Sequence, residues 1–311
     1  MKRFISALLI LILTTSVVFT GCNDNDSFTD SNKLKIVTSI FPYYDFAENI
    51  AGDKAEIKLL LSPGSEPHDY EPTPSDIVAI EKCDIFIYNG GESDKWVDSV
   101  LETLENTDVT VLKMMDYVPL IESDSHHHDE AHSDDCDFDE HIWTSIRNSQ
   151  VLCEKIKSAM MKQDTTNAEF YKSNSENYIS QLQSLDNDMI EIAENKKRDT
   201  IVFGDRFPML YFFNDYGLNH KAAFPGCNSE TEPSLEVVTE LTNYVKDNSI
   251  PAVYYLEFSN GNTANLISEG TEAKALQVSS CHNVTKKDFE SGVSYISLME
   301  NNISSFKEAL Q

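Results

Sequence analysis

Residues 34–51 read LKIVTSIFPYYDFAENIA, and this stretch predicts a strand that leads directly into a helix. Residues 34–40 are rich in β-branched and apolar side chains, as a buried strand is. Residues 43–51 carry a helical pattern of apolar positions. A strand followed at once by a helix is the repeating unit of α/β folds, so this stretch predicts further copies of the unit along the chain.

The alternation of strands and helices continues along both halves of the chain. Further strands are expected at 57–61, 84–88 and 109–112, and then at 200–203, 220–224, 252–258 and 275–278. Helices are expected at 74–82, 96–104, 208–216, 235–247 and 263–271. This order predicts an α/β protein with two βα-type lobes, each built on a parallel four-stranded sheet covered by helices.

A long helical pattern separates the two halves. Apolar residues recur every three or four positions, at Phe170, Tyr171, Tyr178, Leu182, Leu185, Met189 and Ile192. Residues 167–196 contain no Gly or Pro, and thirty helical residues would extend ~45 Å. We expect a rigid linker helix that joins the lobes, and a dimerising coiled coil is the alternative.

The two halves share an approximate internal repeat. Pro63-Gly64 follows an expected strand and Glu71-Pro72 opens the next helix, while Pro225-Gly226 and Glu232-Pro233 repeat this order in the second half. Ligands of open α/β sheets bind at the carboxyl ends of the strands, where these loops lie. The repeat therefore predicts two equivalent loops that face each other across a cleft.

The N-terminus predicts export. Lys2 and Arg3 precede an apolar run over residues 4–19, and sixteen helical residues span ~24 Å, which is short of the ~30 Å core of a bilayer. The tetrapeptide that ends at Cys22, Phe-Thr-Gly-Cys, resembles a bacterial lipobox, so lipidation of Cys22 and an extracytoplasmic, membrane-anchored location are expected. The expected divisions are a lipoprotein signal peptide at 1–21, a flexible tether at 22–33, an N-terminal lobe at 34–165, the linker helix at 166–197 and a C-terminal lobe at 198–311.

Acidic residues dominate the composition. The 311 residues include 52 Asp and Glu against 24 Lys and Arg, for a net charge of −28, and removal of residues 1–21 makes the charge two units more negative. This balance argues against nucleic acid and anionic lipid as electrostatic partners, because both require clustered basic residues. It favours cations, or simply solubility.

One acidic segment is also rich in histidine. Nine acids and five His fall between Glu122 and His141, and no Lys or Arg lies between Lys113 and Arg147. Imidazoles and carboxylates without a competing cation suit divalent transition metals. We expect residues 122–137 to be a disordered loop inserted in the N-terminal lobe. Its histidines, His126, His127, His128 and His132, are expected to collect metal at low affinity; a solvated acidic loop is the alternative.

Two other histidines lie in ordered contexts. His68 is in SPGSEPHDYEPTP (residues 62–74), and His141 is in DEHIWTS (residues 139–145). These motifs resemble those of the metal-binding proteins of bacterial ABC importers for zinc and manganese, whose zinc branch has an acidic His-rich insertion before the second ligand. The resemblance covers the mature chain, including TSIFPYY at 38–44 and YNGGE at 88–92. It implies that His68 and His141 are metal ligands in a monomeric, non-enzymatic protein that delivers its ion to a membrane ABC permease.

The second half departs from the family pattern. Where the family has a third His or a Glu, residues 202–218 read VFGDRFPMLYFFNDYGL, with Gly204 near the usual ligand. Asp205 is the nearest donor, although Arg206 is an alternative partner for it. The family's fourth ligand, an Asp, falls where residues 278–284 read VSSCHNV. We favour His282 there, with Cys281 as the substitute. Cys227 is either a further ligand or a disulfide partner of Cys281.

The chemistry of the proposed ligands restricts which metal ions the site would bind. Neutral imidazoles suit Zn²⁺ or Mn²⁺ and not Ca²⁺ or Mg²⁺, and a third His or a Cys favours zinc. Asp69 and Glu71 are expected to orient His68. The predicted function is high-affinity capture of Zn²⁺ for an ABC importer. The alternatives are a manganese-specific solute-binding protein, a metal-dependent surface protein for cell adhesion and, last, an exported zinc hydrolase with Glu140 as its base.

Overall fold

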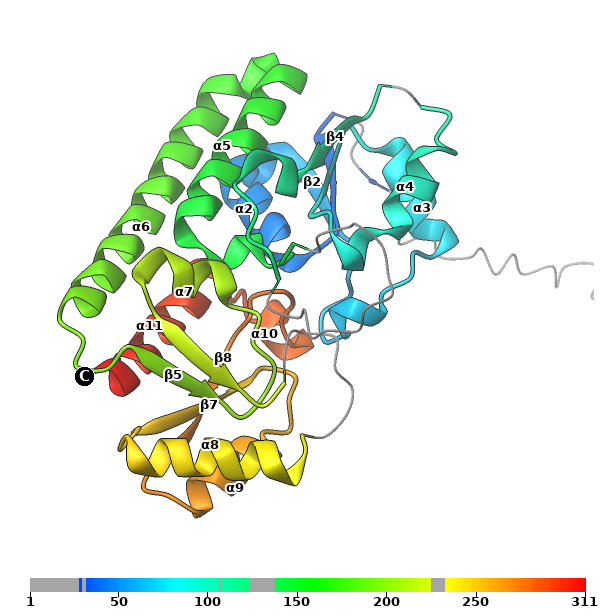
Figure 1. Cartoon of the computed structure of the whole chain (residues 1–311). Coiled ribbons are helices and arrows are strands. Elements are labelled where there is room, and N and C mark those ends of the chain that lie inside the picture. Colours follow the sequence, from blue (N-terminus) through cyan, green and yellow to red (C-terminus); the bar gives the residue numbers. More distant parts are fainter. Residues whose placement is uncertain (1–27, 30–31, 107, 124–137, 225–232) are drawn as a thin grey trace, which may run out of the picture.

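The computed structural model describes residues 28–29, 32–106, 108–123, 138–224 and 233–311. These residues form two α/β lobes, each on its own parallel four-stranded sheet (Figure 1). The first lobe contains β1 (Leu34–Thr38), β2 (Ala55–Leu59), β3 (Ile85–Tyr88) and β4 (Thr110–Lys113). The second contains β5 (Thr200–Phe203), β6 (Asn219–Ala222), β7 (Ala252–Leu256) and β8 (Lys274–Val278). The predicted fold class is confirmed, with strand ends within a few residues of those expected.

The helices of the described chain follow the strands. They are α2 (Phe41–Ala51), α3 (Pro74–Lys82), α4 (Trp96–Leu101), α5 (Ile146–Gln163), α6 (Ala168–Glu194), α7 (Leu210–Tyr216), α8 (Leu235–Asp247), α9 (Asn262–Glu269), α10 (Lys286–Glu290) and α11 (Tyr295–Leu310). Three short 3₁₀ turns bear on the site: η2 (Pro67–Asp69), η3 (Glu92–Asp94) and η5 (Ile142–Thr144). In the described ranges, no helix has both the length and the apolar character that crossing a membrane requires.

The internal repeat extends to the topology. The first sheet has the order β2-β1-β3-β4 and the second has the order β6-β5-β7-β8, so each lobe places its second strand outside its first and then continues through the third and fourth. All pairs are parallel. The predicted loop at Pro225-Gly226 lies outside the described residues, so only the first of the two repeated loops can be placed.

The central strands of each sheet are covered on both faces, which explains apolar runs such as IFIY in β3 and TIVF in β5. The outer face of the first sheet packs on α3 and α4 around Val37, Phe86 and Ile80. The outer face of the second sheet packs on α8 and α9 around Val253 and Ile267. The inner faces of both sheets share one larger core with α2, α5, α6, α7 and α11. The two lobes are therefore joined by this shared core as well as by the connecting chain.

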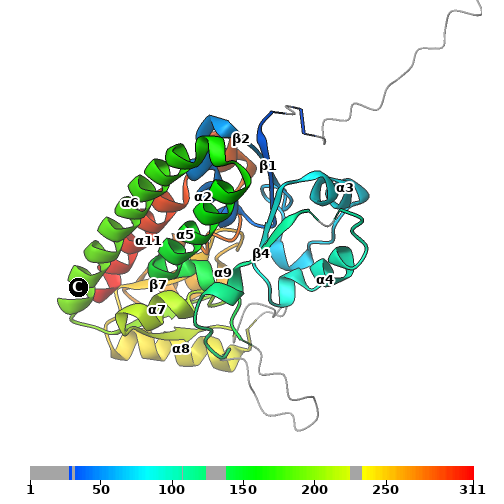
Figure 2. The same cartoon turned by 90° about the horizontal axis from the view of Figure 1, so that it is seen from above.

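The linker helix α6 has a partner that the sequence analysis missed. α6 contains 27 residues and extends about 40 Å. It packs along α5, and also against α2 and α11 (Figures 1 and 2). Its apolar residues are therefore buried within the chain, as at Tyr171, Leu182 and Met189, and the coiled-coil alternative is wrong. α5 and α11 were not predicted, because buried polar residues such as Ser149 and Asn302 interrupt their apolar pattern.

A buried carboxyl group joins α2 to α6. Tyr178 Oη donates a hydrogen bond of 2.6 Å to Asp45 Oδ2, and Asp45 is only 6% exposed. Burial raises the pKa of Asp45 from 3.8 to about 6, although the hydrogen bond from Tyr178 acts in the opposite direction. The folded protein therefore binds a proton at Asp45 more tightly than the unfolded chain does, so protonation of Asp45 stabilises the fold. This stabilisation is complete at pH values below the pKa of Asp45 in the unfolded chain, and it is lost as the pH rises through about 6.

We therefore expect Asp45→Asn to change the pH dependence of unfolding. Relative to the variant, the unmodified protein should lose about 2.4 kcal/mol of unfolding free energy between pH 4 and pH 7, because one pKa unit corresponds to ~1.4 kcal/mol and the unfolded chain is already partly ionised at pH 4. Urea denaturation of the metal-free proteins at several pH values measures this difference. Parallel stability profiles for the two proteins would contradict the prediction.

Candidate metal centre

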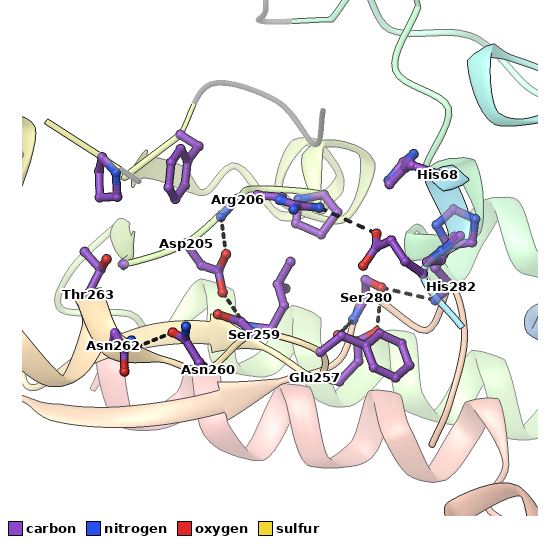
Figure 3. Close-up of a pocket in the computed structure, with 18 of the residues that line it drawn as sticks. His68, Asp205, Arg206, Glu257, Ser259, Asn260, Asn262, Thr263, Ser280 and His282 are labelled. Atoms are coloured by element: carbon purple, nitrogen blue, oxygen red, sulfur yellow. Dashed lines mark hydrogen bonds and ion pairs between the residues drawn. The ribbon is translucent and has the colours of Figure 1, made fainter. Parts of the chain in front are cut away.

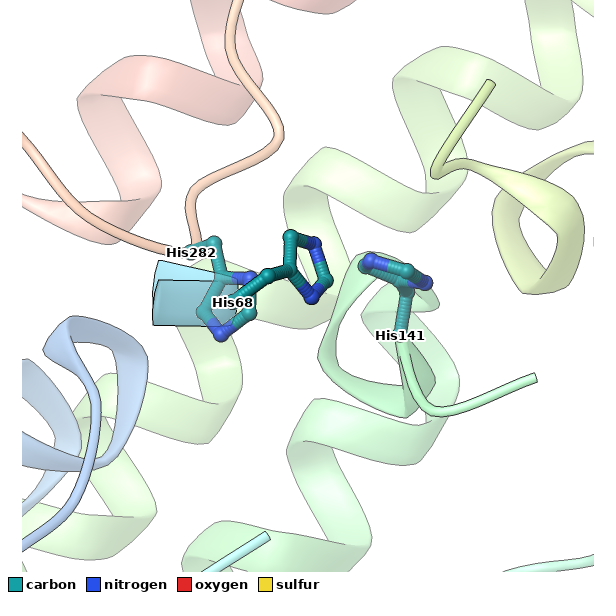
Figure 4. A group of neighbouring side chains, drawn as sticks. All are labelled: His68, His141 and His282. Carbon is teal, nitrogen blue, oxygen red and sulfur yellow. The ribbon is translucent and has the colours of Figure 1, made fainter. Parts of the chain in front are cut away.

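Three histidines from distant parts of the chain meet between the lobes. His68, His141 and His282 each present a ring nitrogen, and these atoms all lie within 4.8 Å of one another (Figure 4). The ring centroids are 6.0 Å apart for His68 and His141, 5.4 Å for His68 and His282, and 5.9 Å for His141 and His282. Ligand nitrogens around Zn²⁺ at ~2.0–2.1 Å lie about 3.3 Å apart, so small rotations of the rings would bring all three nitrogens within reach of one ion.

His68 is oriented through its Nδ1 atom. It lies on η2, after β2, and its Nδ1 is 2.9 Å from Ser93 Oγ and 3.4 Å from Glu140 Oε1. Glu140 also accepts hydrogen bonds from the backbone amide and the hydroxyl of Ser93, at 2.9 and 2.7 Å. Such contacts at Nδ1 are typical of a histidine that binds a metal through Nε2, with a carboxylate behind the ring. Asp69 and Glu71, which were predicted for this role, are exposed.

The local chain explains how Ser93 reaches His68. The amides of Asn89 and Gly90 donate to the buried carboxylate of Asp94, which folds the turn after β3. Gly91 has a φ of +81°, and a Cβ there would lie 2.8 Å from Cβ of Glu140. Gly91 is thus required both by the left-handed backbone and by the close approach of Glu140.

His141 is 3% exposed and directly precedes η5. Its backbone amide and its Nδ1 both contact Asp139 Oδ1, at 2.9 and 3.2 Å. Just before it, Glu122 and Phe138 form an antiparallel bridge, and the amide of Asp139 donates to the carbonyl of Ile121. The two ends of the His-rich segment are therefore paired next to His141. The segment's own histidines, His126, His127, His128 and His132, lie outside the described residues.

His282 is almost as fully buried as His141. It follows β8, is 4% exposed, and its ring lies 4.6 Å from that of Trp143. Burial, together with the neighbouring His141 and His68, holds the pKa of His282 well below its ordinary value. The neutral imidazole is the form that binds a metal.

Glu140 supplies the negative charge of the site. Burial by itself would raise the pKa of Glu140, but the hydrogen bond with His68, the nearby rings of His141 and His282, and the amide of Ser93 together hold it well below its ordinary value. The carboxylate is therefore ionised behind the imidazoles, where it can compensate the charge of a bound cation.

The structure does not bring Asp205 into the histidine group. Asp205 Oδ1 accepts from the amide of Arg206 at 2.8 Å, and Oδ2 accepts from the amide of Leu256 at 3.1 Å (Figure 3). Arg206 pairs instead with Glu66, at 3.5 Å. A Cβ at Gly204 would lie 2.6 Å from the backbone of Ala264 in α9. Gly204, which directly follows β5, therefore packs closely against α9 and has no side chain that could bind a metal.

Of the two cysteine alternatives, Cys281 can be placed, and it is not part of the histidine group. Cys281 is a buried free thiol with a φ of +58°, and its Sγ is 3.9 Å from the carbonyl of Ser279. A free Cys281 contradicts the disulfide with Cys227. Cys227 itself, like Cys22, lies outside the described part of the chain.

The three imidazoles line one end of a cavity of about 530 Å³. The cavity extends between the lobes, past Arg206 and Glu257, to the apolar side chains of Phe224, Leu235 and Leu266. Figure 3 shows this interior, with His68 and His282 at one end and Asn262 and Thr263 at the other. A bound ion would have access to solvent through this space.

Several residues that build the site were missed by the sequence analysis. Ser93 and Asp139 orient ligands, and Trp143 covers two of them while its Nε1 donates to the carbonyl of Ser280 at 2.9 Å. Asn283 holds the chain beside His282. The tryptophan next to a predicted ligand was the one available signal, because a buried indole needs a hydrogen-bond partner nearby.

Comparisons with known proteins agree with this geometry. The family model described as "Zinc-uptake complex component A periplasmic" matches residues 36–309. The chain is 32% identical over 305 residues to the zinc-binding lipoprotein AdcA of Streptococcus pneumoniae, covering 96% of this chain and 60% of that protein. It is 28% identical over 288 residues to the high-affinity zinc uptake system protein ZnuA of Bacillus subtilis, covering 90% and 88%. The chain thus spans about three fifths of the AdcA sequences it matches.

Solved structures show the same architecture. The Zn(II)-bound ZnuA-like domain of Streptococcus pneumoniae AdcA has a TM-score of 0.76 and 31% identity, over 89% of this chain and 99% of that one. The metal-dependent lipoprotein YcdH of Bacillus subtilis has a TM-score of 0.78 and 27% identity, over 90% and 100%. Family match, fold and histidine cluster lead to one conclusion: this chain belongs to the ZnuA family, the periplasmic component A of zinc-uptake complexes.

Proposed function

We propose that this protein captures Zn²⁺ with high affinity outside the cytoplasm and delivers it to a membrane ABC permease. The observation that supports this most strongly is the convergence of His68, His141 and His282, two of them almost fully buried. Three neutral imidazoles favour Zn²⁺ over Mn²⁺, which prefers oxygen ligands. The relatives named as zinc-binding and zinc-uptake proteins support the same ion.

The proposed first shell has three protein ligands from the described chain. His68 and His141 would bind through Nε2, since Nδ1 of each has a partner. The fourth position would face the cavity. Cys227 remains a proposed further ligand, whereas Asp205 is committed to two backbone amides.

The remaining parts of the proposal concern the exported protein. Residues 1–21 would be removed as a signal peptide, and Cys22 would carry the lipid that anchors a monomer to the membrane. Residues 22–33 would be the tether, and the two lobes would be 34–165 and 198–311, with the linker helix at 166–197. The histidines of the inserted loop, His126 to His132, would collect zinc at low affinity beside His141, where the paired ends of the loop lie.

Calorimetric titration of the chain from residue 22 tests this function. Zn²⁺ should bind tightly at one site per chain, Mn²⁺ should bind much more weakly, and deletion of residues 126–132 should remove low-affinity binding while the tight site persists. Tight binding of Mn²⁺ with weak binding of Zn²⁺ would contradict the proposal. So would zinc-dependent turnover of an activated ester, which would indicate a hydrolase.

A further inference from the structure

The loop that carries His282 belongs to both lobes. By chain order it is part of the second lobe, because it follows β8 and precedes α11. Its first residues are held there: Ser279 exchanges two hydrogen bonds with the side chain of Asn302, at 2.9 and 2.8 Å. Ser280 donates its amide and its hydroxyl to the carboxylate of Glu257, at 2.9 and 2.6 Å (Figure 3).

From His282 onward, the same loop is bonded to the first lobe. The carbonyl of His282 accepts from the amide of Phe41 at 3.3 Å, and the carbonyl of Val284 accepts from the amide of Gly64 at 2.8 Å. The side chain of Asn283 donates to two first-lobe carbonyls, those of Ser62 and Ser65, each at 2.9 Å. Both carbonyls lie in the loop that also carries His68.

Cys281 marks the change from one lobe to the other. It has a φ of +58°, and Ser249 is the only other non-glycine residue of the described chain with a positive φ. The left-handed conformation is unfavourable for a side-chain-bearing residue and persists only where its surroundings impose it. Here the backbone is held on both sides, by Glu257 and Asn302 before Cys281 and by Asn283 after it.

We propose that Asn283 is the positioning residue that fixes His282 to the first lobe and thereby sets the rate of metal release. The backbone carbonyl of His282 and the residues that follow it are bonded to the first lobe, although His282 comes from the second half of the sequence and its amide donates to Ser280 Oγ at 3.2 Å. Movement of the second lobe alone would leave the cluster intact. Release requires the hydrogen bonds of Asn283 to break, so that His282 separates from His68 and His141. This inference rests on the proposed function, because the ion whose release it describes is Zn²⁺.

Two buried asparagines provide a matched comparison. Asn283 is 0% exposed and Asn302 is 1% exposed, and each holds the His282 loop through its side-chain amide. Asn302 holds it to the second lobe only. Asn283→Ala should therefore accelerate zinc dissociation at least about tenfold, as loss of outer-shell support commonly does. Asn302→Ala should destabilise the metal-free protein but leave the dissociation rate within about twofold of the original.

Zinc transfer to a chromophoric chelator in a stopped-flow instrument measures these rates. X-ray absorption of the zinc-loaded Asn283→Ala protein should also show fewer bound imidazoles than the unmodified protein, which a merely structural role would not produce. Unchanged dissociation in Asn283→Ala, or equal acceleration in both variants, would overturn the inference. If Asn283→Ala does not fold, Asn283→Ser retains one donor and should show an intermediate rate.

Hydrogen exchange of the metal-free proteins gives a readout that does not depend on zinc. The amide of Gly64, which donates to Val284, should lose protection in Asn283→Ala and keep it in Asn302→Ala. Failure of the unmodified protein to bind zinc would reject the proposed function while this exchange experiment still tests the role of Asn283. Unchanged protection at Gly64 would count against that role.

Discussion

His282→Ala should abolish tight zinc binding while the protein remains folded. Total binding free energies of about 10–16 kcal/mol for a four-ligand zinc site correspond to roughly 3–4 kcal/mol per ligand, so affinity should fall on the order of a hundredfold to a thousandfold. His68→Ala and His141→Ala should have effects of similar size, because the three nitrogens form one cluster. Competition titration against a chelator of known affinity measures the loss.

His220 offers a matched control for these variants. It is a partly buried histidine of the second lobe, stacked on Phe207 with ring centroids 3.6 Å apart, and it is not part of the cluster. His220→Ala should leave zinc affinity within about twofold, although stability should fall through lost packing. Retention of tight, stoichiometric zinc in the His68→Ala, His141→Ala double variant would show that the site lies elsewhere.

Trp143→Ala should cause the largest loss of stability. Its side chain is fully buried in the shared core, and removal of such an aromatic side chain costs about 3–5 kcal/mol of unfolding free energy. It should also weaken zinc binding, since its ring lies 5.3 Å from that of His141 and 4.6 Å from that of His282. Guanidinium denaturation of the metal-free protein and zinc titration measure the two effects.

Trp96, the other tryptophan of the chain, offers a control for the hydrogen bond made by Trp143. Trp143 Nε1 donates to the carbonyl of Ser280, whereas Trp96 Nε1 is buried with no hydrogen-bond partner among the described residues. Trp143→Phe should therefore cost about 1–3 kcal/mol through the unpaired carbonyl, while Trp96→Phe removes an unsatisfied donor and should cost little. Equal costs for the two substitutions would refute this assignment of the hydrogen bond.

The shared core has a consequence for movement between the lobes. The inner faces of both sheets pack on one continuous set of apolar side chains, and α6 runs along both lobes. The end of α11 is attached to the end of α6, because the amide of Lys197 donates to the carbonyl of Leu310. Close-packed interiors resist continuous deformation. Local changes in the His282 loop are therefore a more accessible route to release than rotation of a whole lobe.

The sequence predicted the features that depend on local patterns. The central strands could be predicted because buried parallel strands are continuous apolar runs, as in residues 85–88 and 200–203. His68 and His141 were predicted from motifs in which each ligand lies beside the residues that position its loop. The helix α11 was not predicted, because the polar residue Asn302 interrupts its apolar pattern. Asn302 is buried because its side chain is hydrogen-bonded to Ser279, a contact that only the tertiary structure shows.

The sequence by itself thus predicted the α/β class, the two lobes, the linker helix and all three clustered histidines, although Cys281 remained the alternative to His282. Only the tertiary structure decided the remainder of the site. It excluded Asp205 from the group, because both of its oxygens accept backbone hydrogen bonds, and it brought His282 beside His68 across more than two hundred residues. Local patterns record burial and backbone conformation, but the proximity of distant side chains depends on hydrogen bonds between lobes, such as those of Asn283.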